Sequence, residues 1–249
     1  MPDNRAAKID RGATWLAESE KIVVFTGAGI STESGIPDFR GPDGVWTRRD
    51  KGLPPPKWKT PPDKVKPNAG HIAIVKLQNA GKLKFLISQN VDNLHLASGI
   101  RPELIAELHG NSEIMKCIVC DKRYTKREIG WDDKIHGKGY RTEKPKSNQP
   151  RCACGGRIIS SIVNFGDPMP ERELALAREH SSDCDLFVVL GSSLVVSPAN
   201  YFPMLALEAG AKLIIVNKGE TPIDNRAHLR FFEPIGEVFV PMVEKALAN

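Results

Sequence analysis

A chain of 249 residues with 41% hydrophobic residues can bury one large core, alone or with a small satellite domain. Its apolar runs are far shorter than the roughly 20 residues that a bilayer-spanning helix needs. Residues 1–10 contain no apolar signal core, so we expect a soluble, cytoplasmic protein without a membrane partner. The formal net charge of +5 is too small to indicate nucleic-acid binding, which stays a weak alternative. The sequence leaves the oligomeric state open.

The hydrophobic pattern predicts strands and helices in alternation. Short β-branched runs that are apolar on both faces predict buried parallel strands at Ile22–Thr26, Lys84–Ser88, Ile158–Val163, Leu186–Leu190 and Leu213–Val216. Apolar residues at three- and four-residue spacing predict helices at Gly70–Asn79, Glu171–His180, Ala199–Ala209 and Glu237–Ala248. This alternation predicts an α/β fold with an open, doubly wound parallel sheet of the Rossmann-like type.

Two stretches interrupt this pattern. Residues 46–68 are rich in proline and lack periodicity, which predicts an irregular excursion packed near the second stretch. That stretch, residues 112–159, contains four cysteines and few apolar residues, which predicts a small module held together by a metal. Residues 1–45, 69–111 and 160–249 would then form the Rossmann-like domain.

Four of the five cysteines form two close pairs. In a chain without a secretion signal, such pairs favour metal ligation over a disulfide framework. Two residues separate Cys117 from Cys120, and one residue separates Cys152 from Cys154. Together these thiols suit a closed tetrahedral site for one structural zinc ion. The fifth, Cys184, precedes an apolar strand and is interpreted as a buried structural thiol.

A glycine-rich segment, GAGISTESGIPDFRG at residues 27–41, follows the first predicted strand. Glycines at this turn would let the backbone approach a diphosphate, and a helix that opens at Ser31 and Thr32 would offer unpaired N–H groups. The third glycine of the usual dinucleotide fingerprint is absent, as is an acidic residue after the second strand. Taken alone, the turn is equally compatible with tight packing.

Two polar segments follow later in the chain. QNVDNLH at residues 89–95 comes directly after the strand at 84–88, so its amides and carboxylate would lie at the carboxyl edge of the sheet. LHGN at residues 108–111 places His109 on the seam between the two predicted domains, where a cleft is expected. Because the reference pKa of histidine is about 6.5, His109 is a candidate general base.

Together these three segments resemble the signature motifs of the sirtuins, the NAD-dependent protein lysine deacylases, over Ile22 to Leu247. FRGPDGVWT at residues 39–47 and ISQNVD at residues 87–92 look most like the class IV branch, which contains the sixth and seventh mammalian sirtuins. Two positions depart from the family pattern, Asn93 and the Cys152-x-Cys154 spacing. The resemblance implies a Rossmann-like fold, NAD consumed as a co-substrate, one structural zinc ion and acylated-lysine proteins or peptides as partners.

The resemblance also implies roles for individual residues. His109 would be the general base, Asn90 would order water near C1′ of the ribose, and Asp92 would receive the nicotinamide amide. The implied cofactor-binding residues are Gly27, Ala28, Gly29, Thr32, Asp38, Phe39, Arg40, Gln89, Val91, Gly191, Ser192, Ser193, Asn217, Lys218 and Ile235. The implied substrate-binding residues are Val163, Phe165, Gly166 and Val196.

The expected reaction is deacylation of protein N6-acyl-lysine, giving nicotinamide and 2′-O-acyl-ADP-ribose. No Tyr-x-x-Arg pair follows Trp46, which disfavours succinyl and malonyl groups and leaves acetyl and longer acyl chains open. One alternative is a protein mono-ADP-ribosyltransferase. A second is an NAD-sensing module that binds nucleic acid or chromatin.

Overall fold

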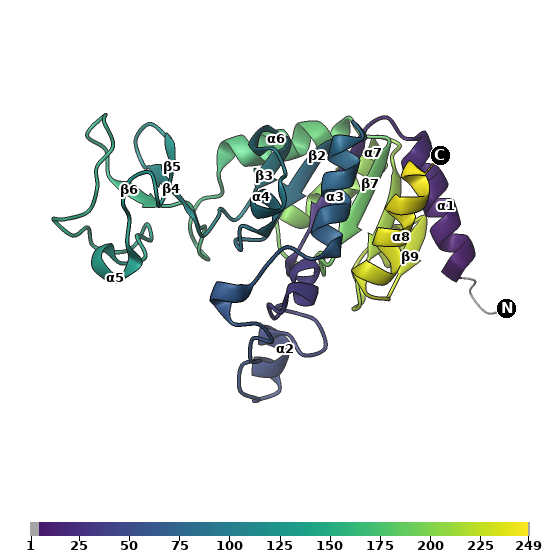
Figure 1. Ribbon diagram of the computed structural model, residues 1–249, viewed down its shortest axis with the longest axis horizontal. Coiled ribbons are helices and arrows are strands. Elements are labelled where there is room, and N and C mark those ends of the chain that lie inside the picture. The colour runs from purple at the N-terminus through teal and green to yellow at the C-terminus, as the bar shows by residue number, and fades with distance from the viewer. Residues whose placement is uncertain (1–4, 249) are drawn as a thin grey trace.

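The computed structural model describes residues 5–248, and its larger part is a six-stranded parallel sheet (Figure 1). The strand order is β3-β2-β1-β7-β8-β9, and every neighbouring pair is parallel. The bounds are β1 Ile22–Thr26, β2 Leu83–Ser88, β3 Ile105–Glu107, β7 Leu186–Leu190, β8 Lys212–Val216 and β9 Leu229–Phe231. The α/β fold with an open, doubly wound parallel sheet is therefore confirmed.

Helices cover both faces of this sheet, which is why its central strands are apolar throughout. Successive residues of a strand point to opposite faces, so Ile22 and Val24 enter one core while Val23 and Phe25 enter the other. The first core also receives α1 Arg5–Glu18, α3 Ala69–Asn79 and α8 Ile235–Leu247. The second receives α6 Glu171–Ser182 and α7 Phe202–Glu208. Each predicted helix thus corresponds to an observed one, with Ala199–Ala209 divided into η4 Ala199–Tyr201 and α7.

A small module projects from one end of the large sheet (Figure 1). It contains β4 Ile114–Cys117, β5 Arg123–Thr125 and β6 Ile158–Ser160, which form an antiparallel sheet of order β5-β4-β6, and the short helix α5 Asp133–His136. The prediction of a buried parallel strand at Ile158–Val163 is wrong. The run forms a strand only as far as Ser160, and it pairs antiparallel with β4 of the small module, with Ile158 opposite Cys117.

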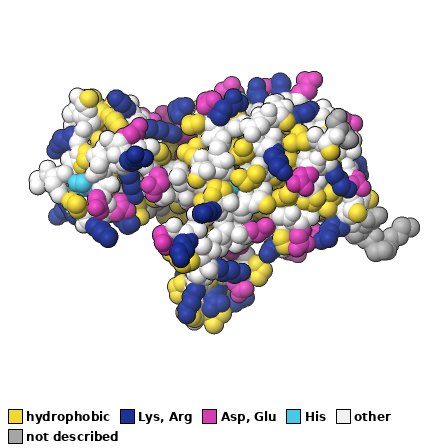
Figure 2. Space-filling view, in the orientation of Figure 1, with side chains coloured by type: hydrophobic (Ala, Val, Ile, Leu, Met, Phe, Trp, Pro, Cys, Tyr) yellow, Lys and Arg dark blue, Asp and Glu magenta, His cyan; other side chains and the backbone are white. Residues whose placement is uncertain are grey.

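The proline-rich segment forms a separate projection, which contains the short helices α2 Val45–Asp50 and η2 Pro62–Lys64 (Figure 1). The remaining short helices are α4 Leu94–Ser98, η1 Ala28–Ser34, η3 Pro102–Leu104 and η5 Asp224–Arg226. Within residues 5–248, no helix combines the length and apolar character needed to cross a membrane. On the face shown in Figure 2, Lys and Arg side chains are scattered among acidic and hydrophobic ones rather than gathered into one patch.

Candidate active site

The carboxyl ends of β1, β2, β7 and β8 meet at one edge of the large sheet, and the strand order reverses between β1 and β7. Open parallel sheets bind ligands in the crevice outside such a reversal, because the loops after the two strands diverge there. The predicted residues at 27–32, 89–92, 191–193 and 217–218 directly follow these strands. The topology therefore brings separate sequence motifs to a single edge.

The glycines after β1 are required by close packing against the turn after β7. The N–H of Gly29 donates to the carbonyl oxygen of Gly191 at 2.9 Å. A Cβ atom on Gly29 would lie 2.7 Å from the Cα and the oxygen of Gly191, and one on Gly27 would lie 2.8 Å from that oxygen. Gly191 itself has a φ of +66°. Tight packing, one of the two explanations left open by the sequence, therefore accounts for these glycines in the structure.

The helix at this turn is η1 Ala28–Ser34, a 3-10 helix that is preceded by Gly27 and contains Gly29. The expectation that it opens at Ser31 and Thr32 is wrong, because the chain turns at once after β1. Inside this tight helix, the hydroxyl of Thr32 donates to the carbonyl oxygen of Gly29 at 2.8 Å. The helix ends at Gly35, whose φ of 96° is in the left-handed region that favours glycine.

A hydrogen-bonded group joins η1 to the loop after β2. The Ser31 hydroxyl donates to Oδ2 of Asp92 at 2.6 Å and accepts from Nδ2 of Asn90 at 3.2 Å. Oδ1 of Asp92 accepts from the N–H of Leu94 at 3.0 Å. Ser31 and Asn90 are both buried. The predicted pair Asn90 and Asp92 is therefore held in place by a serine that the sequence reasoning treated only as a helix residue.

His109 lies beside the same loop. Its Nδ1 is 2.8 Å from the carbonyl oxygen of Gln89, and since a carbonyl can only accept, Nδ1 carries the proton. Nε2 is then the basic nitrogen. Burial lowers the pKa of His109, while the bond to Gln89 acts in the opposite direction. Nε2 of Gln89 also donates to the Ser192 hydroxyl at 2.8 Å, so this one side chain links the loops after β2 and β7.

The remaining residues that were predicted to bind the cofactor come from several segments of the chain. Asp38 accepts a hydrogen bond from the N–H of Gly41 at 3.0 Å; burial raises its pKa, while that bond and the charge of Lys218 lower it. Arg40 and Lys218 are exposed cations. Asn217 is half-buried and its Nδ2 donates to the Gly219 carbonyl oxygen at 2.9 Å. The further predicted residues are the half-buried Ser193, Val91, whose carbonyl oxygen accepts from Ser112 at 2.8 Å, and Ile235, which is in the first core.

Three of the four predicted substrate residues, Val163, Phe165 and Gly166, lie in one stretch after the small module, and Phe165 and Gly166 are exposed. The N–H of Val163 donates to the carbonyl oxygen of His109 at 3.0 Å, which places the stretch beside the candidate base. Phe165 is 89% exposed, and its ring meets that of Trp46 edge-on with centroids 6.5 Å apart. Trp46 also stacks on Phe39 at 6.0 Å. Gly166 has a φ of +90°, and Val196 is half-buried in the loop after β7.

The four paired cysteines lie together in the small module. Three of their sulfur–sulfur distances are 3.5 Å for Cys117–Cys154, 3.6 Å for Cys120–Cys152 and 3.5 Å for Cys120–Cys154. Ligands at about 2.3 Å around a tetrahedral zinc ion stand about 3.8 Å apart. The pKa of Cys152 is lowered to about 6, chiefly by the Tyr124 hydroxyl 3.1 Å from its sulfur, which favours the thiolate that a metal needs. The N–H of Gly156 lowers the pKa of Cys154, but hydrogen bonds with the other three sulfurs raise it to about 12, so the four thiols share their protons unequally. The cluster fits a zinc ion despite the single-residue Cys152–Cys154 spacing.

Comparison with known proteins identifies the family. The model of the Sir2 family matches residues 27–57 and 55–198. An NAD-dependent protein deacetylase of Rhodopseudomonas palustris is 41% identical over 92% of this chain and 93% of its own length. The chain belongs to the Sir2 family.

Solved structures of Sir2 proteins agree with this result. One described as "Structural Basis for the Mechanism and Regulation of Sir2 Enzymes" has a TM-score of 0.73 at 36% identity and covers 97% of this chain and 98% of its own. Another, "Sir2-p53 peptide-NAD+", has a TM-score of 0.70 at 35% identity over the whole of both chains. The chain spans about half the length of two plant relatives, the NAD-dependent protein deacetylases SRT1 of Oryza sativa (46%) and Arabidopsis thaliana (49%). Placement of this sirtuin in the class IV branch stays a prediction.

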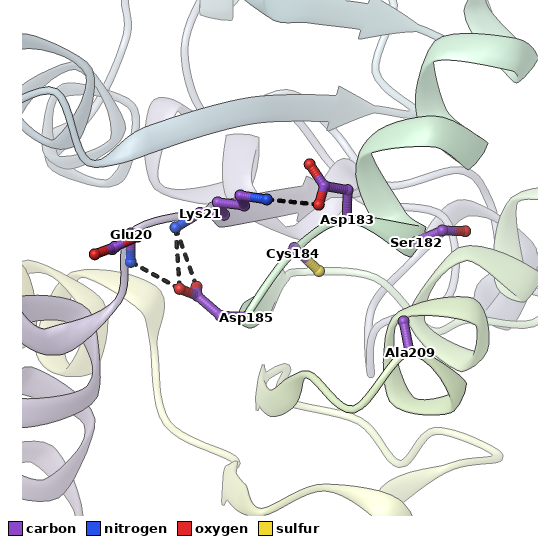
Figure 3. A pocket seen from close by; sticks show the side chains of 7 residues that line it. All are labelled: Glu20, Lys21, Ser182, Asp183, Cys184, Asp185 and Ala209. Carbon is purple, nitrogen blue, oxygen red and sulfur yellow. Dashed lines mark hydrogen bonds and ion pairs between the residues drawn. The ribbon is translucent and has the colours of Figure 1, made fainter.

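A cavity of about 270 Å³ lies at the opposite, amino-terminal edge of the sheet and is unrelated to this site (Figure 3). Its polar groups largely satisfy one another: Asp185 accepts from the N–H of Glu20 at 2.7 Å and of Lys21 at 3.2 Å, and the Lys21 amine contacts Asp183 at 2.6 Å. The Cys184 thiol lies 3.4 Å from the carbonyl oxygen of Ser181, and burial raises its pKa to about 12. Cys184 is therefore a buried thiol outside the group of four cysteines in the small module.

Sequence reasoning did not predict that two histidines lie together in the sirtuin, behind the loop that follows β2. His71 and His95 are buried with ring centroids 4.9 Å apart, and Nε2 of His95 lies 2.9 Å from the Thr26 hydroxyl. Burial lowers the pKa of His71 to about 4 and that of His95 well below its usual value. Both are therefore neutral packing residues at pH 7. The signal in the sequence was their position in otherwise apolar helical segments.

Proposed function

We propose that this Sir2-family chain catalyses NAD-dependent deacylation of N6-acyl-lysine in proteins or peptides, with His109 as the general base. The observation that carries the proposal is the orientation of His109. Its Nδ1–H is held by the carbonyl oxygen of Gln89, which leaves the basic Nε2 for proton removal within the group of predicted catalytic residues. The pKa of His109, lowered by burial, keeps the ring neutral near pH 7.

The donor set along the sheet edge fits NAD. The exposed cation Arg40 suits a phosphate, and the side chains of Gln89 and Asn217 suit ribose hydroxyls, with Lys218 beside the adenine. When bound, NAD supplies the ribose carbon that accepts the acyl oxygen and releases nicotinamide. The remaining cofactor residues predicted from the motifs contribute backbone and shape along this edge in the same proposal.

In the proposed reaction, the side chains of the protein first orient the substrates and then remove a proton. Ser31 holds the carboxylate of Asp92 and the amide of Asn90, so both are fixed before the substrate binds. Asp92 would bind the nicotinamide amide, and Asn90 would order water near the reacting carbon. His109 would remove a proton from a ribose hydroxyl, which makes that oxygen nucleophilic. The products are free lysine, nicotinamide and 2′-O-acyl-ADP-ribose.

The substrate groove would be formed by two loop segments, residues 163–168 and 191–198. An acylated peptide can add between them as a strand, because backbone hydrogen bonds give affinity with little demand on sequence. Val163 would accept the lysine N–H through its carbonyl, and Gly166 and Val196 would contact the peptide. Phe165, with Trp46 and Phe39 beside it, offers an exposed apolar surface for an acetyl or longer acyl chain.

The four cysteines would hold one structural zinc ion, which closes the module of residues 112–159 and leaves no open position for catalysis. Residues 1–45, 69–111 and 160–249 would form the NAD-binding domain, with 46–68 as the excursion beside the substrate groove. A cytoplasmic location is part of the proposal, because free thiols in a metal-ligand arrangement suit a reducing compartment. Cell fractionation tests the location.

The test is mass spectrometry of an acyl-lysine peptide panel incubated with and without NAD. We expect acyl loss only with NAD, and loss of activity by at least about a hundredfold in His109→Ala. His228→Ala is the matched control, because His228 is exposed and lies at the opposite, amino-terminal edge of the sheet, just before β9. Cleavage without NAD, or a fully active His109→Ala, contradicts the proposal. Label from NAD retained on protein without acyl release would instead favour mono-ADP-ribosyl transfer.

A further inference from the structure

A buried junction of polar side chains connects the small module, the NAD-binding domain and the catalytic loop. Its centre is Glu107, the last residue of β3, two positions before His109. The Glu107 carboxylate accepts a hydrogen bond from Nδ2 of Asn111 at 2.6 Å, and its N–H donates to Oε2 of Glu173 at 3.2 Å. Glu173, on α6, is 1% exposed and pairs with Arg123 of the small module. None of these four side chains contributes to the reaction described above.

Asn111 carries the connection from Glu107 to the catalytic loop. It is completely buried, and its Nδ2 gives the second hydrogen to Oδ1 of Asn93 at 2.9 Å. Its Oδ1 accepts from the N–H of Glu113 at 2.8 Å, so the orientation of the amide is determined. All the hydrogen-bonding groups of this side chain are thereby used except one acceptor lone pair. A change at Glu107 must therefore act on the Asn93 contact.

Asn93 is the residue through which such a change would reach the reacting groups. Its φ of 66° is in the left-handed region, which asparagine adopts more readily than other non-glycine residues but which still needs support from neighbouring contacts. It directly follows Asp92. Relaxation of Asn93 would therefore turn Asp92 away from Ser31.

We propose that Glu107 is a positioning residue for the reaction, acting through Asn111 and Asn93 on the loop of residues 89–93, and that the Arg123–Glu173 ion pair connects this position to the small module. The inference rests on the proposed function, because it assigns the loop of Asn90 and Asp92 to the reaction. The carboxylate form of Glu107 supports the loop best, since an ionised acceptor makes the stronger hydrogen bond to Asn111.

The charge of Glu107 changes close to neutral pH. Burial raises its pKa to about 7; the hydrogen bond from Asn111 and the charge of Arg123 lower it, and the charges of Glu173 and Asp92 raise it. The carboxyl group is then about 10% ionised at pH 6 and about 90% ionised at pH 8. The acidic side of the wild-type pH profile would contain two ionisations, that of Glu107 near pH 7 and that of His109 at lower pH.

The first experiment compares kcat and KM for NAD of the wild type and Glu107→Gln from pH 5.5 to 9. Glutamine keeps the shape and an acceptor oxygen but has no ionisation. We expect Glu107→Gln to keep KM within about twofold and to reduce the ratio of kcat at pH 8 to kcat at pH 6 by up to about tenfold, as the ionised fractions require. Glu103→Gln, the same change at an exposed position on the preceding turn, should leave the profile unchanged.

The connection to the module is tested with Arg123→Met. Arg123 lowers the pKa of Glu107, so its removal should move the acidic side of the kcat profile to higher pH. A profile that keeps its wild-type midpoint in Arg123→Met would overturn this half of the proposal. Near-ultraviolet circular dichroism of each variant at pH 8 confirms that the tertiary fold is retained.

Hydrogen exchange of the free protein separates this proposal from the proposed function. After correction for the intrinsic effect of pH, residues 89–94 of the wild type should be less protected at pH 6 than at pH 8. Glu107→Gln should show equal protection at both. If no deacylation occurs but the exchange follows this pattern, the positioning role stands and the proposed function fails. If the wild type is active and Glu107→Gln has the wild-type pH profile and exchange, the positioning role is refuted.

Discussion

Removal of one sulfur ligand should test the zinc cluster without disturbing apolar packing. Cys154 is exposed, so Cys154→Ala deletes a ligand but little buried surface. The core of the module is small, since its hydrophobic cluster contains only five buried residues, Met115, Cys117, Trp131, Cys152 and Ile158, two of which are themselves predicted ligands. The metal must therefore contribute much of the stability of this module.

The expected magnitude follows from the four equivalent sulfur contacts. Zinc binding to structural sites contributes roughly 10–16 kcal/mol, so one of four ligands accounts for about 3 kcal/mol. This corresponds to a decrease in zinc affinity of roughly a hundredfold. Cys184→Ala is the matched control. It removes a buried sulfur outside the cluster, at a cost of about 1–2 kcal/mol for the small cavity, and should leave zinc affinity unchanged.

Competition with a chromogenic chelator, together with zinc determination by mass spectrometry, measures both variants. We expect about one zinc ion per wild-type chain, and loss of the ion from Cys154→Ala at chelator concentrations that leave the wild type loaded. Limited proteolysis should then cut Cys154→Ala between residues 121 and 151 while the large sheet stays intact. Unchanged chelator competition in Cys154→Ala, or zinc loss in Cys184→Ala, would refute the assignment.

Two further predictions concern stability. Gly29→Ala places a Cβ atom 2.7 Å from the backbone of the neighbouring turn and should lower the free energy of unfolding by about 1–3 kcal/mol in urea, whereas Gly219→Ala, whose nearest atom would be 3.8 Å away, should have little effect. Equal stability of the two variants would contradict the packing argument. His71 and His95 have pKa values below those of the unfolded chain, so the unfolded state binds more protons and stability falls as the pH decreases from about 6.5 toward 4, by up to about 1.4 kcal/mol per pH unit for each histidine. Urea unfolding at pH 7 and pH 5 measures this best in Glu107→Gln, because the raised pKa of Glu107 acts in the opposite direction, and equal stability at the two pH values would contradict it.

The large sheet was predictable because its inner strands carry their own signal. β1, β2, β7 and β8 are buried on both faces, so uninterrupted apolar runs identify them. β3 and β9, each three residues long, were not predicted, since so short a run has no distinctive pattern. The helix α1 was missed although its buried residues Ile9, Ala13 and Leu16 have the three- and four-residue spacing of an amphipathic helix. Ile158–Val163 was assigned to the wrong sheet, because a short apolar run does not specify its partner strand.

The candidate site, too, could be predicted only in part from the sequence. Asn90 and Asp92 were found from the sequence because their motif continues a predicted strand. His109 was found from the contiguous motif LHGN, although the strand before it, β3, was not predicted. Their supports, Ser31 for Asp92 and Glu107 for Asn111, are contacts between residues 61 and 4 positions apart respectively. The contact of Glu107 with Asn111 joins residues close in sequence. It can affect the loop of residues 89–93 only because Asn111 also bonds to Asn93, 18 positions away.

The sequence by itself determined the fold class, the pairing of four cysteines into one candidate metal site and the family, because strand hydrophobicity, cysteine spacing and a contiguous motif are local properties of the chain. The tertiary structure alone decided which strand Ile158 pairs with, why Gly29 must be glycine and which nitrogen of His109 is basic. Each of these depends on a neighbour that folding brings close. For Ile158 it is the partner strand β4, for Gly29 the backbone of Gly191, 2.7 Å from where a Cβ atom would lie, and for His109 the carbonyl oxygen of Gln89 at 2.8 Å. Such distances between remote segments are set by packing of the whole core.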